Sequence, residues 1–287
     1  MADDNGDYNI YGYNPSIPAA AIFIVLFGIS TAYHGVQLVR ARALYFIPFV
    51  IGGLFQVLGY VFRAVSHNNY TSIPLYALQT LLILLAPALY AASIYMVLGR
   101  LVVHLDAEHL SIVRVNWMTK IFVTGDVVSF LAQCAGGGLM SGDNPDSRST
   151  GETITIAGLI IQLLFFGFFL ITSILFHFRL NRSPTARSTE STLHWSLKNN
   201  VTARNWVTLL CALYIVSVFI LIRSVFRLIE FIDGYGGFLM THEAFIYIFD
   251  AVLMVGVMGV LNWWHPSYVI RDGKKGRGMA GFSEMPL

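Results

Sequence analysis

The sequence predicts an all-α, polytopic membrane protein with seven transmembrane helices, and three observations lead to that fold class. Hydrophobic residues make up 56% of the 287 residues and charged residues only 12%, compared with about 25% charged residues in soluble domains. The mean hydropathy is +0.64. The apolar residues gather in long runs, and the loops between those runs alternate in positive charge. Together these features exclude a soluble, disordered or collagen-like chain.

Seven apolar runs are each long enough to cross a bilayer as a helix, which takes about 20 residues. Each run is too long for a strand of a membrane barrel, and none alternates between polar and apolar residues with a period of two. Because the backbone in lipid must satisfy its own hydrogen bonds, such runs form helices. In chain order the predicted spans are residues 17–39, 44–65, 75–98, 117–137, 154–177, 206–228 and 244–263.

The loops that separate these runs, taken in chain order, differ sharply in positive charge. The N-terminal segment and the loops after the second and sixth runs contain no Lys or Arg, and the loop after the fourth run contains only Arg148. Cytoplasmic loops are enriched in Lys and Arg, so the N-terminus is predicted to lie outside and the C-terminus in the cytoplasm. The fourteen positive residues on the cytoplasmic side are Arg40, Arg42, Arg100, Arg114, Lys120, Arg179, Arg182, Arg187, Lys198, Arg204, Arg271, Lys274, Lys275 and Arg277.

This topology divides the chain into three parts. Residues 1–16 form an extracellular N-terminal segment, residues 17–263 the seven-helix transmembrane domain, and residues 264–287 a basic cytoplasmic tail. The first segment lacks the basic start and the small-residue cleavage motif of a signal peptide. The sequon that starts at Asn69 lies in a loop predicted to be outside, so Asn69 is the expected glycosylation site.

Four of the predicted spans carry polar side chains at helical spacing, which places the polar residues of each span on one face. A charged side chain inside a span costs about 2.5–3.5 kcal/mol on insertion scales, so each one needs a partner or a function. We expect these faces to meet around a charged cavity that opens outward and narrows to a carboxylate near the midplane. The residues are Gln56, Tyr60 and Arg63 in the second span, Asp126 and Gln133 in the fourth, Arg223, Arg227 and Glu230 in the sixth, and Glu243, Tyr247 and Asp250 in the seventh.

All eleven of these polar residues are candidate substrate-binding residues. Two interpretations of them stay open. The arginines and the outer carboxylates can pair with one another and lock the bundle, or they can bind a substrate. Asp126 has no basic residue near it on its own helix. An intramembrane carboxylate of this kind indicates a functional site by default.

Several chemistries lack the residues that they need. None of the four lysines lies deep in a span, which excludes a retinal Schiff base. No set of His and Cys residues has the spacing of metal ligands, and neither a phosphate-binding glycine loop on the cytoplasmic side nor a hydrolase triad is recognisable. The sequence therefore predicts no catalytic residue, no metal, no cofactor and no nucleic-acid partner.

Several motifs occur in a fixed order along the seven spans. They are Gly59-Tyr60-Val61-Phe62-Arg63, then Ala86-Pro87 with Tyr95, then Asp126 with Gln133 and Gly136-Gly137-Gly138, and then Arg223-Ser224-Val225-Phe226-Arg227-Leu228-Ile229-Glu230 with Gly234, Gly237, Glu243, Tyr247 and Asp250. With these motifs the chain resembles the fungal resistance-to-aminocholesterol family, also called lipid-translocating exporters, from Tyr13 to about Asn262. One position departs from the family pattern, since Gln56 stands where the family usually has Glu.

The resemblance implies a seven-helix fungal protein of the plasma membrane, or of another endomembrane. Members of the family are associated with export or translocation of sphingoid long-chain bases, with resistance to toxic amphiphiles and with porphyrin handling. The first hypothesis is therefore a translocase for amphipathic lipids. In that hypothesis Asp126, Asp250 and Glu243 bind an amino headgroup, and the arginines bind a phosphate or carboxylate.

Two other functions remain as alternatives. One is a seven-helix lipid receptor that binds the same molecules without moving them, and the other is an intramembrane lipid enzyme. The expected partners are membrane lipids and an amphipathic small molecule, and assembly into a homo-oligomer stays open.

Overall fold

The computed structural model describes residues 16–67, 72–140, 144–190, 205–233 and 243–270, and every regular element in these ranges is helical. Seven helical segments within them are long and apolar enough to cross a membrane. They confirm the all-α fold class and the seven predicted spans. Asn69, residues 1–15 and residues 271–287 of the basic tail lie outside the described residues.

The helices follow the order of the predicted spans. The first six spans are α1 (Ile17–Ala41), α2 (Ile47–Ser66), α3 (Ile73–His104), α4 (Val115–Met140), α5 (Pro145–Arg182) and α7 (Trp206–Asp233). The seventh is built from α9 (Glu243–Ile246), the π-helical turn η3 (Tyr247–Val252), α10 (Leu253–Trp263) and the short α11 (Ser267–Ile270). Two 3-10 turns, η1 (Leu44–Phe46) and η2 (Glu108–Leu110), precede α2 and α4.

Helix α5 extends well beyond its apolar run, which predicted only residues 154–177. It begins at Pro145, and the side chain of Asn144 accepts a hydrogen bond from the backbone N–H of Asp146 at 3.2 Å. Asn is a favoured N-cap, Pro fits the first turn, and an acidic residue there interacts well with the helix dipole. The added turns are polar, so a search for apolar residues does not find them.

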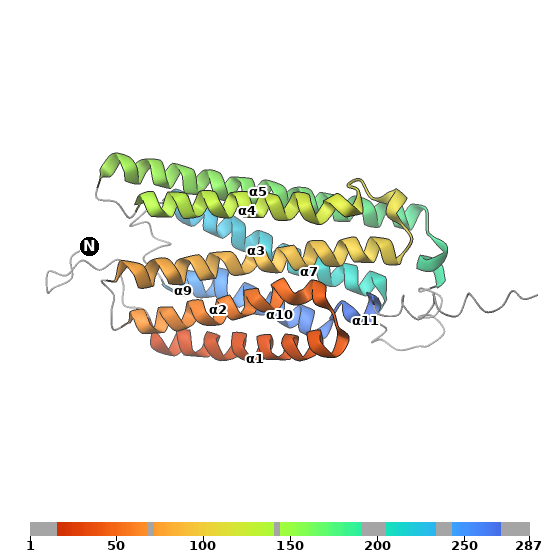
Figure 1. Ribbon diagram of the computed structural model, residues 1–287, viewed down its shortest axis with the longest axis horizontal. Helices are drawn as coiled ribbons and strands as arrows, with labels where there is room; N and C mark the ends of the chain where they lie inside the picture. The colour runs from red at the N-terminus through yellow and green to blue at the C-terminus, as the bar shows by residue number, and fades with distance from the viewer. Residues whose placement is uncertain (1–15, 68–71, 141–143, 191–204, 234–242, 271–287) are drawn as a thin grey trace, which may run out of the picture.

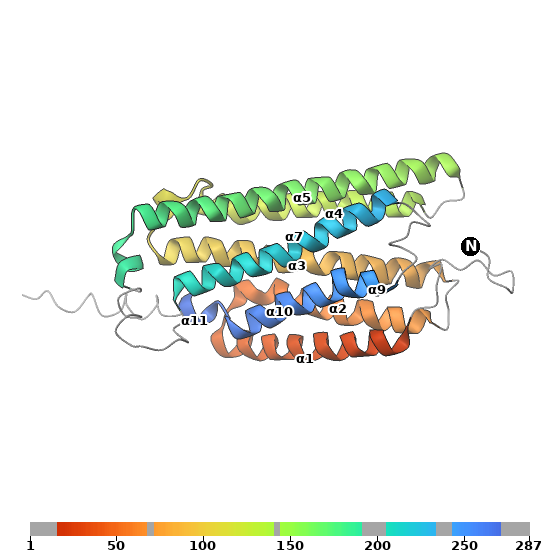
Figure 2. The ribbon, with the colours of Figure 1, turned by 180° about the vertical axis from the view of Figure 1, so that it is seen from behind.

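The helices form an elongated bundle and run roughly along its long axis (Figure 1). Consecutive helices from α1 to α5 pack on one another, and the chain returns through α7 and α10 to α1, which closes a ring. Figure 2 shows the α4 and α5 pair along one edge and α1 along the other. Helices α3 and α7 also contact each other across the middle, and more of each is buried than of α1 or α5.

The two ends of the bundle differ in the residues that they hold. The Ser16 end contains the starts of α1, α3, α5 and α9 and the ends of α2, α4 and α7, and the Ala41 end contains the opposite termini (Figure 1). Under the topology predicted from the loops, the Ser16 end would face outward.

Helices α4 and α5 pack together through small residues. A side-chain carbon added at Gly136 would overlap the backbone oxygen of Gly151 and the hydroxyl of Thr155. Nearby, the hydroxyl of Ser129 donates a hydrogen bond to the backbone oxygen of Gly158 at 2.8 Å. Small residues let membrane helices approach this closely, so the pair forms a fixed wall on one side of the bundle.

Candidate functional site

Near the Ser16 end, six charged side chains gather into what we call the ion-pair cluster. They come from three parts of the bundle that are far apart in sequence, and five of the six are buried. The members are Arg63 of α2, Arg223, Arg227 and Glu230 of α7, Glu243 of α9 and Asp250 of η3.

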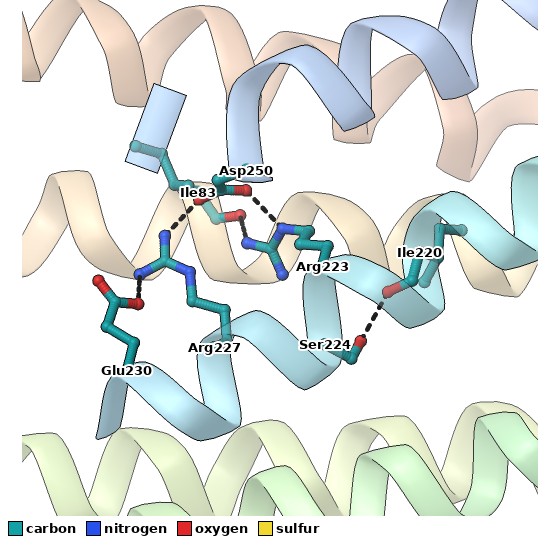
Figure 3. Close-up of polar contacts among 7 residues, drawn as sticks. All are labelled: Ile83, Ile220, Arg223, Ser224, Arg227, Glu230 and Asp250. Atoms are coloured by element: carbon teal, nitrogen blue, oxygen red, sulfur yellow. Dashed lines mark hydrogen bonds and ion pairs between the residues drawn. The ribbon is translucent and has the colours of Figure 1, made fainter. Parts of the chain in front are cut away.

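Asp250 lies between two arginines of α7 (Figure 3). Its carboxylate accepts hydrogen bonds from Nε of Arg223 and from Nη2 of Arg227. Arg223 also donates through Nη2 to the backbone oxygen of Ile83 at 3.1 Å, and Arg227 donates through Nη1 to Glu230 at 3.0 Å. Because Ile83 belongs to α3, these contacts join three helical segments of the bundle.

Arg63 forms the other half of the cluster. Its Nη2 lies 2.9 Å from Oε1 of Glu243, and its Nε donates to the hydroxyl of Tyr247 at 3.1 Å. The guanidinium carbon is also 5.2 Å from the centre of the Tyr247 ring. Glu243 in turn accepts the backbone N–H of Ser16 at 3.0 Å. The pair therefore holds α2, α9 and the start of α1 together.

Within the described residues, every carboxylate of the ion-pair cluster contacts an arginine and every arginine contacts a carboxylate. Its three positive and three negative charges cancel inside the protein. Removing one partner of a buried pair leaves an uncompensated charge, which costs about 3–5 kcal/mol. The geometry thus favours the interpretation in which these residues lock the bundle.

The π-helical turn η3 supplies two of the contacts described above. Tyr247 and Asp250 both lie in it, and they reach α2 and α7 respectively. A π-turn inserts an extra residue into a helix and is frequent at functional sites. The sequence offers no signal for this turn.

Two polar side chains of α2, spaced to lie on the same helical face as Arg63, have no hydrogen-bond partner among the described residues. They are the hydroxyl of Tyr60 and the amide of Gln56, and both residues are fully buried. The Tyr60 ring stacks with Phe23 and Phe27 of α1, with ring centres 5.7 and 5.5 Å away. Aromatic packing therefore holds Tyr60 in place.

Asp126 has a very different environment in the middle of α4. Its Oδ2 accepts a hydrogen bond from the hydroxyl of Tyr95 at 3.0 Å, and its Oδ1 has no partner among the described residues. The residue is 5% exposed and forms no ion pair in the described part of the chain. The rings of Phe122, Phe166 and Phe169 pack around Tyr95, so this carboxylate lies in apolar surroundings.

The fourth span does not join the ion-pair cluster as the sequence led us to expect. The partners of Asp126 and Gln133 are Tyr95 on α3 and Gln162 on α5, the latter at 3.0 Å. Along α3, Tyr95 lies twelve residues from Ile83, where Arg223 binds, which is about 18 Å at 1.5 Å per residue. The polar residues therefore form two separate sites instead of one cavity.

Tyr95 is the residue that sequence reasoning missed as part of a site. It was recognised only within a motif, although a hydroxyl in the apolar span of α3 already indicates that a polar partner must lie nearby. Among the described residues, no three His, Cys, Asp or Glu side chains are placed to hold a metal ion.

The amino-acid sequence is similar to a known protein family and to several yeast proteins. The family described as "RTA1 like protein" matches residues 49–273. Among Saccharomyces cerevisiae proteins, Protein RTM1 is 37% identical over 89% of this chain and 91% of its own length. Protoporphyrin uptake protein 1 is 36% identical over 90% and 92%, and Sphingoid long-chain base transporter RSB1 is 28% identical over 94% and 76%. No solved structure matches the chain.

Proposed function

The chain belongs to the RTA1-like family of membrane proteins, and from this premise we propose that it is a translocase for amphipathic lipids with an amino headgroup. Sphingoid long-chain bases are the substrate class that we favour. Asp126 is the counter-charge of the amino group while the headgroup crosses the membrane. The resemblance read from the sequence motifs is confirmed by the family match.

The proposal rests on one observation, which is that the carboxylate of Asp126 has no positively charged partner among the described residues. It is buried within α4, has a single hydrogen-bond donor and lacks any arginine or lysine partner among the described residues. A charge on such a residue costs about 2.5–3.5 kcal/mol on insertion scales. A bound ammonium group would remove most of that cost and would use the free Oδ1.

The name of one relative supports the same substrate class, because RSB1 is a sphingoid long-chain base transporter. The ion-pair cluster is a poorer candidate for the headgroup site, since its carboxylates already bind arginines. We assign it the role of holding α1, α2, α7 and the seventh span in register. Its six members, with Tyr247 and Tyr60, would then support the path without touching the headgroup.

The topology read from the loops completes the proposal. The N-terminus and Asn69 would lie outside, Asn69 would be glycosylated, and the basic tail would lie in the cytoplasm. The protein would reside in the plasma membrane, or in another endomembrane. These statements rest on the charge distribution and on family resemblance.

The test is lipid movement in proteoliposomes of purified protein, with fluorescent sphingosine and fluorescent phosphatidylcholine measured in parallel. Each measurement is made with and without an imposed proton gradient. We expect sphingosine to move faster than in empty vesicles, and Asp126→Asn to lower that flux by about two orders of magnitude because the amine loses its counter-charge. Asp146→Asn, at an exposed acid of α5, is the matched control and should keep its flux.

Equal movement in wild-type and empty vesicles under both conditions would overturn the translocase proposal. Full activity of Asp126→Asn would instead leave translocation standing and remove Asp126 from the path. Both variants must keep the thermal midpoint of the wild-type protein for these outcomes to be decisive.

A further inference from the structure

A groove of ≈ 390 Å³ runs between α4 and α5 in the half of the bundle at the Ala41 end. Its walls are apolar and include Ile121, Val128 and Phe165. The aromatic ring of Phe165 lies directly over Gly125, where an added side-chain carbon would overlap it. Gly125 thus lets the Phe165 ring lie close against α4, and the groove opens on the outer surface of the bundle, where Trp117, Ile121 and Val128 are exposed.

The length of the groove fits one hydrocarbon chain. Its α4 residues run from Trp117 to Val128 along a single helical face, a rise of about 16 Å at 1.5 Å per residue. One leaflet contributes about half of the 30 Å hydrocarbon core of a bilayer. An acyl chain that starts at the level of Trp117 would therefore span its leaflet within the groove.

The mouth of the groove is basic. Lys120 lines it, with its ammonium 5.4 Å from the ring centre of Trp117, which is itself 56% exposed. Arg114 is exposed immediately before α4 begins at Val115, six residues before Lys120. Trp and Lys at this position are typical of the membrane interface, where the aliphatic stem of Lys covers apolar surface and the ammonium reaches the headgroups. The only acid of α4 is Asp126, which is buried and bonded to Tyr95.

We propose that this groove is a binding site for an anionic phospholipid of the leaflet at the Ala41 end. One acyl chain lies along Ile121, Gly125 and Val128 against Phe165, and the negative headgroup contacts Lys120 and Arg114. The site is distinct from Asp126, which faces α3. It does not depend on the proposed translocase activity.

The test uses the purified full-length protein in detergent, titrated with phosphatidylserine or with phosphatidylcholine. Bound lipid is counted by native mass spectrometry, and the thermal midpoint is followed in the same samples. We expect phosphatidylserine to bind at one saturable site and to raise the midpoint by about 5 °C at saturation. Phosphatidylcholine should bind without saturation and leave the midpoint unchanged.

Two kinds of variant distinguish the contribution of the lipid headgroup to binding from that of the acyl chain. The double variant Arg114→Gln and Lys120→Gln should weaken phosphatidylserine binding by about 30-fold, since each basic residue near the surface contributes about 1 kcal/mol. Arg40→Gln, at the same end of the bundle on α1, is its control. Val128→Trp should fill the groove and abolish the saturable site, whereas Val127→Trp, equally exposed but outside the groove, should not.

Equal binding of the two lipids, or phosphatidylserine binding that neither the charge variant nor Val128→Trp alters, would overturn the proposal and leave the groove filled by bulk lipid. Inorganic phosphate, titrated in a parallel sample, should not raise the midpoint, because it lacks the chain that occupies the groove.

Discussion

The ion-pair cluster and the Asp126 site bury charge in the same bundle in two opposite ways. In the cluster, Asp250 contacts both Arg223 and Arg227, and each of these arginines has a further acceptor. At the other site, Asp126 has one hydroxyl donor and no cation among the described residues. In the first arrangement every charge has a partner within the protein, and in the second one carboxylate oxygen has no partner among the described residues.

This difference separates stability from activity. Breaking a fully paired buried cluster destabilises the fold, because the remaining charge is left without its partner. A carboxylate with a free oxygen contributes little to folding, and it remains able to bind a proton or an ammonium group. Substitutions in the ion-pair cluster should therefore lower the free energy of unfolding more than the lipid flux per folded molecule. Substitutions at the Asp126 site should lower the lipid flux more than the free energy of unfolding.

The largest effect on stability should come from Asp250→Asn. The change leaves Arg223 without an acid among the described residues, so we expect a loss of about 3–5 kcal/mol in the free energy of unfolding. Denaturant unfolding in detergent measures it, with the exposed Glu190→Gln as control. A variant that folds as well as the wild type but no longer moves lipid would make the cluster a binding site and break the distinction.

A smaller loss is expected for Glu243→Gln. Its side chain is 18% exposed, and the change replaces a carboxylate that accepts from Arg63 and from the backbone of Ser16. Hydrogen bonds to charged groups contribute about 1.5–3 kcal/mol. Hydrogen exchange at the start of α1 should quicken, because that start is held by the carboxylate. Unchanged exchange there would show that Glu243 does not anchor α1.

Tyr95→Phe tests the Asp126 side of the comparison. The change removes the one donor to the carboxylate and keeps the ring, so stability should fall by about 1 kcal/mol. Lipid flux should fall several-fold because the carboxylate is no longer held in position. The control is Tyr90→Phe in the same helix, which removes a hydroxyl that donates a hydrogen bond to the sulfur atom of Met258 at 3.2 Å. Equal flux in both variants would argue that Tyr95 does not orient Asp126.

The smallest effect should come from Gln56→Met. The amide of Gln56 is buried without a partner among the described residues, so an apolar side chain of similar size should change stability by less than about 1 kcal/mol, in the stabilising direction. Thermal unfolding provides the measurement. A large loss of stability would mean that the amide has a partner in the membrane, such as a bound water or lipid.

Most of the fold follows from the apolar runs, because helix formation in lipid leaves few alternatives. The apolar runs indicate only the most hydrophobic part of each helix. They therefore did not predict the polar turns at the start of α5 or the last turns of α3, residues 99–104. The local signals for the longer α5 were Asn144, Pro145 and Asp146, which together favour the start of a helix.

The polar faces of single helices were also readable from spacing, and Arg63, Arg223 and Asp250 lie where that spacing indicates. The sequence did not predict which polar faces pack against one another, because the spacing of residues within one helix gives no information about the neighbouring helices. The pairing of Asp126 with Tyr95 depends on α3 packing against α4, and the reach of Asp250 depends on the π-turn η3. Both are products of the assembled bundle.

The most direct test of the contrast between the two regions is sphingosine flux per folded molecule, measured for Asp126→Asn and Asp250→Asn in the same proteoliposome preparation. We expect Asp126→Asn to unfold at the wild-type temperature and to move sphingosine no faster than empty vesicles. Asp250→Asn should give little folded protein, with flux per folded molecule close to that of the wild type. The reverse pattern, a stable but inactive Asp250→Asn beside an active Asp126→Asn, would contradict the assignment of the two regions.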